Sequence, residues 1–301
     1  MAIRAVLPLD IGLPFKAEAS LESQEKNLMQ LFIQTLISPV AKFTPELAFF
    51  LSEPLVMVPP RYTMTCLEKA YLETGHYFTI RHGNTRLAAW SWGDGPTIYL
   101  LHGWGGRGAQ FIRFVPELLQ AGYSVVLLDA PAHGSSGGQK ATVRDFAGAL
   151  SSAVESCGPA HGVVGHSLGA AAAVLAIRQG LKVKRAVFVA PPECPAPYLN
   201  QLMHKLKLED AMLSRFQECI THRVGTRRED VSLAQQGSDL SATWLMISDT
   251  DDEEVPLTTV ERIAKIWPAV EWMKTSGWGH RKILRAPEVI RRTAAFMGEG
   301  G

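Results

Sequence analysis

From residue 76 onward, short apolar runs alternate with longer stretches of helical periodicity. Apolar runs of this length are typical of strands buried on both faces. The first two predicted strands form a pair around the turn His82-Gly83-Asn84, and the remaining six alternate with helices. Such alternation predicts a mostly parallel sheet covered by helices on both faces, which is the α/β class. The predicted strands are 77–80, 87–92, 97–101, 124–128, 162–164, 186–189, 244–247 and 270–273.

Residues 1–75 differ in pattern and predict a helical extension before this domain. Thr65 and Glu68 have the spacing of a capping box at a helix start. Because amphipathic stripes usually face a core, we expect these helices to pack on the domain. The apolar run 47–51 leaves open an interfacial anchor or a substrate-gating arm. One helix is predicted by apolar residues at helical spacing, Leu28, Leu31, Phe32 and Leu36.

The connection between the sixth and seventh predicted strands is several times longer than a usual link between helix and strand. It opens with a Pro-rich segment, and helical stretches follow at 199–206 and 209–224. We therefore expect a domain over 76–301 with a helical cap inserted at about 192–240.

Charge and composition argue against a nucleic-acid-binding or membrane-binding protein. The chain is 47% hydrophobic and 20% charged with a net charge of +1, which is typical of an ordinary globular protein. A chain this close to neutral has no global field to attract nucleic acid or an acidic membrane. Pro8, Asp10 and Pro14 interrupt the first apolar residues before they could form a signal peptide. We expect a cytoplasmic protein with no nucleic-acid partner and no stable membrane insertion.

The cysteines argue against a metal site or a disulfide framework. None of the four belongs to a Cys-x-x-Cys pair, and they are widely separated. Reduced structural thiols are the expected state. The four are Cys66, Cys157, Cys194 and Cys219.

The first motif with catalytic potential is Gly165-His166-Ser167-Leu168-Gly169. It follows an apolar run and opens a stretch of small residues, which is the strand, sharp turn and helix that a nucleophile elbow requires. The alternative is a Gly-rich turn that holds a buried serine. The motif predicts Ser167 as a nucleophile.

The second motif is the Gly-rich segment His102-Gly103-Trp104-Gly105-Gly106, directly after the third predicted strand. Acyl transfer passes through a negatively charged oxygen that two backbone N–H groups stabilise. Leu168, after the serine, and Trp104, in this segment, are the candidate donors. A structural Gly-rich loop is the alternative.

These motifs resemble those of the α/β-hydrolases, and most closely compact bacterial serine carboxylesterases, from about residue 76 to the C-terminus. The family pattern Asp-x-x-Val-Pro is matched by 252–256, and its terminal Gly-His by Gly279-His280. The loop 129–136 is similar to the family's loop after the fourth strand. Ser248-Asp249 departs from the His-Gly or His-Asp of many relatives. The resemblance implies an α/β-hydrolase fold with nucleophile, acid and histidine in that order along the chain.

A serine hydroxyl needs a base to accept its proton and a third group to orient that base. Ser167, His280 and Asp252 are the residues that the resemblance implies for these roles. From the residues alone the acid stays open, because Asp249 and Asp251 lie on the same loop. The acidic run there could suggest calcium, but it lacks the spacing and the glycine of a calcium loop. No metal site is predicted.

A substrate pocket is the least constrained part of the prediction. Aromatic and thioether side chains could line an acyl or alcohol site, although each could equally belong to the core. The candidates are Trp104, Met203, Phe216 and Trp278.

The predicted function is a serine hydrolase that cleaves a small-molecule carboxylic ester through an acyl-enzyme, without a cofactor. A thioesterase, amidase, acyltransferase or carbon–carbon hydrolase with the same triad is the nearest alternative, because fold and triad do not separate these reactions. A ligand-binding protein on a hydrolase fold is the alternative from another class. Haloalkane or epoxide chemistry is disfavoured, since those reactions normally use a carboxylate nucleophile in this fold.

Overall fold

The computed structural model describes residues 57–193, 232–233, 242–267 and 270–299, together with the isolated positions 40, 44, 47, 50 and 51. Most of the predicted extension and most of the predicted cap therefore lie outside the described residues. The same holds for the helices expected at 28–36, 199–206 and 209–224.

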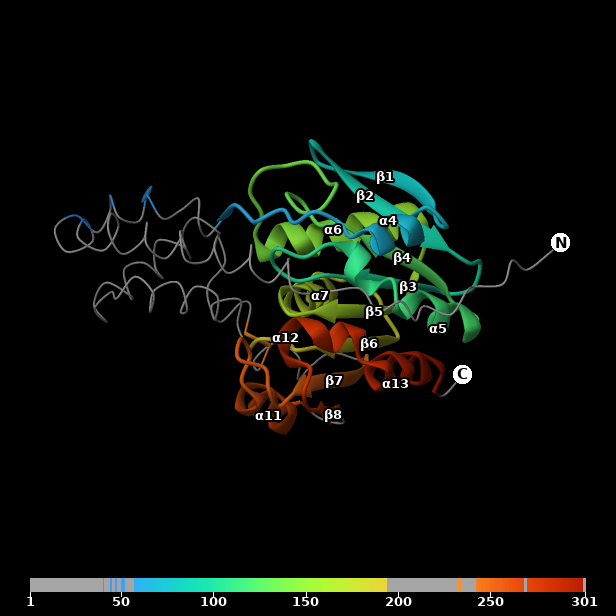
Figure 1. The fold of residues 1–301 in the computed structure, drawn as a ribbon, viewed down its shortest axis with the longest axis vertical. Coiled ribbons are helices and arrows are strands. Elements are labelled where there is room, and N and C mark those ends of the chain that lie inside the picture. The colour runs from blue at the N-terminus through green and yellow to red at the C-terminus, as the bar shows by residue number, and fades with distance from the viewer. Residues whose placement is uncertain are drawn as a thin grey trace.

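An eight-stranded sheet in the order β1-β2-β4-β3-β5-β6-β7-β8 forms the centre of the molecule (Figure 1). β1 and β4 each pair antiparallel with β2, and every other pair is parallel. All eight strands expected from the apolar runs are present, which confirms the predicted α/β fold. The strands are β1 His76–His82, β2 Thr85–Trp92, β3 Thr97–Leu101, β4 Ser124–Leu128, β5 Ala160–His166, β6 Arg185–Val189, β7 Thr243–Asp249 and β8 Glu271–Thr275.

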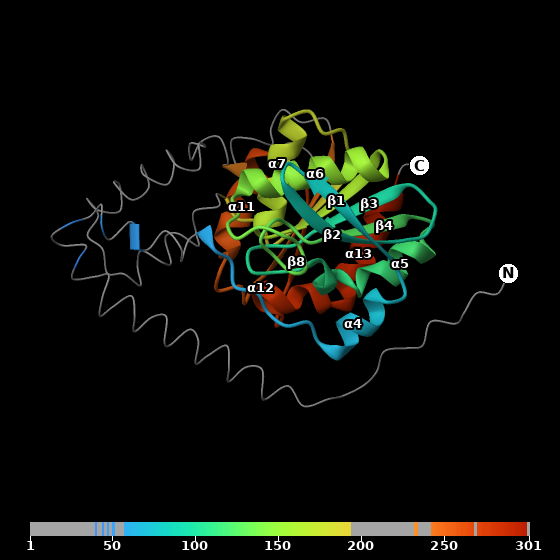
Figure 2. The ribbon, with the colours of Figure 1, turned by 90° about the horizontal axis from the view of Figure 1, so that it is seen from above.

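Helices cover both faces of this sheet. α6 and α7 lie on one side, and α5 and α13 lie on the other (Figure 2). Short helices follow the loops after β3 and β8. The helices are α4 Cys66–Leu72, η2 Gly108–Phe111, α5 Phe114–Gln120, α6 Val143–Cys157, α7 Leu168–Arg178, α11 Leu257–Ile266, α12 Gly279–Lys282, η4 Ile283–Arg285 and α13 Pro287–Gly298.

The double covering explains why central strands such as β3 and β4 are apolar on both faces. Successive side chains of a strand point to opposite faces. In β3, Tyr99 and Leu101 belong to the core cluster under α6 and α7, whereas Ile98 and Leu100 belong to the cluster under α5 and α13. All four are fully buried. Burying one such side chain stabilises the fold by about 1.5–3 kcal/mol, so alternation of polar and apolar residues would be costly here.

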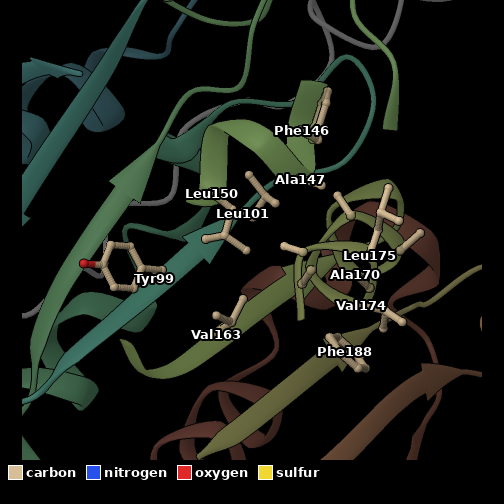
Figure 3. Packing of buried hydrophobic residues seen from close by; sticks show 14 of the residues in the cluster. Tyr99, Leu101, Phe146, Ala147, Leu150, Val163, Ala170, Val174, Leu175 and Phe188 are labelled. Atoms are coloured by element: carbon tan, nitrogen blue, oxygen red, sulfur yellow. The ribbon is translucent and has the colours of Figure 1, made fainter. Parts of the chain in front are cut away.

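Small residues on α7 bring that helix close to the sheet. Ala170 through Ala173 are all buried, and α7 packs beside the larger side chains of α6. Figure 3 shows the contact from close by. Its labelled side chains come from β3, α6, β5, α7 and β6: Tyr99, Leu101, Phe146, Ala147, Leu150, Val163, Ala170, Val174, Leu175 and Phe188.

The capping box predicted at Thr65 and Glu68 is present and starts α4. The Glu68 backbone N–H donates to Thr65 Oγ1 at 3.2 Å, and the Thr65 N–H donates to Glu68 Oε2 at 2.8 Å. Among the described residues, no helix has both the length and the apolar character to cross a bilayer.

Candidate active site

Ser167 lies between the end of β5 and the start of α7, in a strained backbone conformation. Its φ of 51° and ψ of −121° fall where residues with a side chain are rare. Gly165 and Gly169 allow the turn, because a Cβ on either would collide with backbone. The clash at Gly169 would be 2.3 Å from the Leu101 carbonyl oxygen. The strand, strained serine and helix are the geometry of a nucleophile elbow.

The segment after β3 lies directly against this serine. A Cβ added to Gly103 would sit 2.9 Å from Ser167 Cβ. Leu168 is the first residue of α7, so its N–H has no partner within the helix. The two candidate donors therefore lie in segments next to Ser167. Leu168 follows it directly in the sequence, and Trp104 belongs to the segment that lies against it. Trp104 also packs against the sheet core through its ring.

His102 holds the segment after β3 in shape. Its Nδ1 donates to the Gly103 carbonyl at 2.7 Å, and its Nε2 accepts from the Ala130 N–H at 3.0 Å. Burial is the main reason that the pKa of His102 lies well below its ordinary value. The ring is thus neutral, and its two hydrogen bonds support the loop.

His280 and Asp252 are joined by a buried hydrogen bond. His280 Nδ1 lies 2.8 Å from Asp252 Oδ2, and both side chains are almost fully buried. The other oxygen of Asp252 accepts from the backbone N–H groups of Glu254 and Val255 at 2.8 and 2.7 Å. The carboxylate is therefore fixed, and it orients the imidazole through Nδ1.

Asp249 has a different task, which separates it from Asp252. It ends β7 and accepts hydrogen bonds from the Thr275 hydroxyl and from the N–H groups of Asp251, Trp278 and Gly279. Burial raises the pKa of Asp249, but these hydrogen bonds outweigh burial and lower it overall. Asp249 thereby fixes the loop that carries His280, without bonding to its ring.

Asp251 is also occupied elsewhere, since its Oδ2 accepts from the Gly277 N–H at 2.9 Å. The three aspartates of one short loop thus have three different partners. Within the described part of the chain, which includes this loop, no group of three or more His, Cys, Asp or Glu could hold a metal ion.

His166 links the elbow to the loop at 276–280 after β8, which carries His280 and which we name the histidine loop. Its Nε2 donates to the His280 carbonyl at 2.8 Å, and the two rings lie 4.9 Å apart. Burial is the main cause that lowers the pKa of His166 to about 3, so the ring stays neutral. Sequence reasoning missed this hydrogen bond between His166 and His280.

Glu254 is a second residue that sequence reasoning missed. Its Oε2 lies 3.7 Å from His280 Nε2 and its Oε1 lies 3.4 Å from Arg281 Nε. The side chain is 44% exposed, so it forms part of the solvent side of the site. Its position two residues after Asp252, in the motif already identified, was the available signal.

Of the four predicted pocket residues, Trp104 and Trp278 belong to the described part of the chain. Met203 and Phe216 lie outside the described residues. The indole of Trp278 packs against the core under α5 and α13, and its Nε1 donates to Glu288 Oε1 at 2.8 Å. Its backbone N–H, bonded to Asp249 at 3.3 Å, is the part that shapes the histidine loop.

A strained serine after the fifth strand, with an Asp–His pair on later loops at the same edge of a mostly parallel sheet, defines the α/β-hydrolase class. The Alpha/beta hydrolase family model matches residues 98–285, which is more than half of the chain, and the chain belongs to this family. A comparison with curated proteins finds no significant match.

Solved structures show the same fold at low sequence identity. An esterase from Pyrococcus furiosus is 21% identical with a TM-score of 0.60, and the match covers 80% of this chain and 96% of that one. An esterase from Exiguobacterium antarcticum is 16% identical with a TM-score of 0.58, covering 73% and 98%. A meta-cleavage product hydrolase from Pseudomonas fluorescens is 15% identical with a TM-score of 0.58, covering 74% and 98%. At these identities the likeness shows the fold.

Proposed function

We propose that this chain is a serine hydrolase that cleaves carboxylic esters through an acyl-enzyme, with Ser167, His280 and Asp252 as its triad. The observation that carries the proposal is the strained backbone of Ser167, whose neighbour His166 donates a hydrogen bond to the backbone carbonyl of His280 in the buried His280–Asp252 pair. A serine hydroxyl in that conformation projects from the turn, where a neighbouring base can take its proton.

In the first half of the reaction, the Ser167 hydroxyl attacks the acyl carbon and its proton passes to His280 Nε2. The carbonyl oxygen becomes an oxyanion, which the N–H groups of Leu168 and Trp104 stabilise. The intermediate collapses, and His280 returns the proton to the departing alkoxide. Asp252 holds Nδ1–H throughout and stabilises the imidazolium.

In the second half, water replaces the alcohol. His280 takes a proton from water, the hydroxide attacks the acyl carbon, and the same two N–H groups stabilise the second oxyanion. The serine oxygen leaves with the proton held by His280, and the carboxylic acid is released. Every proton in this cycle moves through the chain's own residues, so no cofactor is required.

Covalent labelling tests the nucleophile. A fluorophosphonate probe, followed by intact mass and peptide mapping, should give one stoichiometric adduct on Ser167 of the wild-type protein. Ser167→Ala should give none. Ser156→Ala is the matched control, because Ser156 is exposed on α6 and bonds only locally to Ser152. No adduct on folded wild-type protein would contradict the proposal and favour a ligand-binding protein on a hydrolase fold.

A substrate panel tests the bond that is cleaved. We expect short p-nitrophenyl esters to be hydrolysed with the highest kcat/KM among matched esters, thioesters and anilides, and Ser167→Ala to lower that value by at least about 10³-fold. A thioester or an anilide with a higher kcat/KM than its ester would keep the triad but reassign the reaction.

A further inference from the structure

We propose that residues 57–68, which we name the strap, position the oxyanion-stabilising segment 102–107 and thereby set the turnover rate. The inference rests on the proposed function, because it concerns the N–H of Trp104 in that segment. The strap lies outside the residues that the family model matches, and three independent sets of contacts join it to the site.

The first set of contacts comes from Arg61. Its guanidinium donates to the carbonyl oxygens of Gly134, Ser136 and Gly138 at 3.0, 2.9 and 3.0 Å. All three belong to the loop 129–138 that follows β4. A guanidinium presents its donors in a fixed plane, so three bonds to one loop define the shape of that loop.

This loop in turn holds the segment 102–107. The Ala130 N–H donates to His102 Nε2 at the start of the segment. The Asp129 carboxylate accepts at 2.6 Å from the N–H of Gly108, the residue that follows the segment. The ring of His133 packs against those of His102 and Trp104, with centroids 5.1 and 5.3 Å apart. A displacement of the loop by loss of Arg61 would therefore be passed to Trp104.

The second set of contacts is direct. Gly105 has a φ of +65°, and a Cβ there would lie 3.1 Å from Pro60 Cγ and 3.6 Å from Tyr62 Cε2. The strap thus lies against one neighbour of Trp104. Its other neighbour, Gly103, lies against Ser167. Trp104 therefore connects one residue that lies against the nucleophile with another that lies against the strap.

The third set is a buried ion pair at the end of the segment. Glu68 Oε2 lies 2.6 Å from Arg107 Nη2, with both side chains only 10–11% exposed. The same carboxylate oxygen accepts from the Thr65 N–H at 2.8 Å. One carboxylate therefore starts α4 and fixes the last residue of the segment.

These contacts act on a donor that is used most strongly in the transition state. Loss of one oxyanion donor typically costs 10²–10³-fold in kcat, and a partial displacement costs less. We expect Arg61→Met to lower kcat about tenfold and to leave KM within about twofold. Arg61→Lys keeps the charge but not the planar fork, so it should recover only part of the loss.

The matched control is Arg292→Met. Arg292 also bonds to more than one partner, Glu271 and Glu299, but Glu271 begins β8 at the amino edge of the sheet, opposite the site. Affinity for an arylboronic acid, which forms a tetrahedral adduct with the serine, should fall with kcat in the Arg61 variants. A merely structural role would lower the yield of folded protein without this correlation.

The outcomes separate the two proposals. A wild-type protein with neither esterase activity nor a Ser167 adduct would overturn the proposed function, and the strap's role with it. An active wild type whose Arg61→Met variant matches Arg292→Met in kcat and boronate affinity would overturn the role of the strap alone.

If Arg61→Met does not fold, Gly105→Ala tests the role of the strap instead. Pro60→Ala removes Pro60 Cγ, the nearest atom to the added Cβ, so the Pro60→Ala/Gly105→Ala double variant should have a higher kcat than Gly105→Ala. An equal or lower kcat would contradict the strap.

Discussion

The nucleophile elbow and the histidine loop are built by different physical means, although they meet at one edge of the sheet. Ser167 is held by steric fit. Gly165 and Gly169 lie so close to neighbouring backbone that neither position has room for a Cβ. His280 is held by hydrogen bonds: its Nδ1–H donates to Asp252, and the N–H of the neighbouring Gly279 donates to Asp249.

This difference predicts how each region responds to substitution. A methyl group added at the elbow has no room beside the neighbouring backbone. It should therefore destabilise the fold, and by the same amount at every pH. A hydrogen-bonded loop can lose one bond at a time, so its variants should fold and lose activity or pH-dependent stability by degrees. The four experiments below test this contrast, from the largest effect to the smallest.

Asp252→Asn should have the largest effect, and it should be on activity. The amide cannot carry the negative charge that stabilises imidazolium, and it favours the wrong tautomer of His280. We expect kcat for a p-nitrophenyl ester to fall about 10³-fold or more, or about 4 kcal/mol, with little change in unfolding free energy. Asp251→Asn is the control, because Asp251 bonds to Gly277 and not to the ring. A loss of less than tenfold in Asp252→Asn would remove Asp252 from the triad.

Gly169→Ala should be the largest effect on folding. Its Cβ would lie 2.3 Å from the Leu101 carbonyl oxygen and 2.5 Å from that of His102, and backbone cannot yield as a side chain can. We expect a loss of about 3 kcal/mol in unfolding free energy, measured by urea denaturation, despite the better helix propensity of Ala.

The matched control for Gly169→Ala is Gly148→Ala in α6. The three atoms nearest to its Cβ would all belong to the His82 ring, the first being Cε1 at 2.7 Å. That ring ends a side chain that can turn away, so the loss should be under about 1 kcal/mol. Equal losses in the two variants would mean that the elbow has no special steric demand.

Asp249→Asn should cost about 2 kcal/mol of stability near neutral pH, because four donors lose a charged acceptor. The folded-state pKa lies below the ordinary value of 3.8. The contribution is therefore complete above that value and disappears as the pH falls through the lower, folded-state pKa. Urea denaturation of wild type and variant should give a constant difference at pH 6–8 that shrinks below about pH 4. A difference that grows in acid would contradict the role given to Asp249.

The sequence predicted the strands and the elbow because both depend on local composition. A run such as 125–128 is apolar at every position only if both faces are covered, and the spacing of Gly165, Ser167 and Gly169 describes one turn. The acid could not be chosen in the same way. From their residue type alone, Asp249, Asp251 and Asp252 are equivalent. They differ only once the later loop presents backbone N–H groups to Asp249 and Asp251 and the His280 ring to Asp252.

The strap shows a second limit of the sequence. The capping box of Thr65 and Glu68 is a local pattern and was predicted, but Glu68 also pairs with Arg107, which is 39 residues away. Likewise, Arg61 reaches carbonyl groups more than 70 residues later. A carbonyl acceptor has no sequence signature, so only the folded chain reveals these partners.

His166 connects the two regions, and its substitution should have the smallest effect of the four. His166→Phe keeps an aromatic ring on the elbow but removes the donor to the His280 carbonyl, so His280 loses one support while Asp252 still orients its ring. We expect kcat to fall about tenfold, which corresponds to about 1.4 kcal/mol. His166→Gln can still donate to that carbonyl and should retain more of the activity.

The pH profile separates this positioning role from a role in proton transfer. Because burial lowers the pKa of His166 to about 3, the ring is neutral throughout an assay from pH 6 to pH 9. The loss in His166→Phe should therefore be the same at every pH in that range, measured as kcat for one ester. A loss confined to low pH would mean that His166 takes up a proton during turnover. Full activity in His166→Phe would mean that steric fit at the elbow and the bonds of Asp249 and Asp252 position His280 without this link between the two regions.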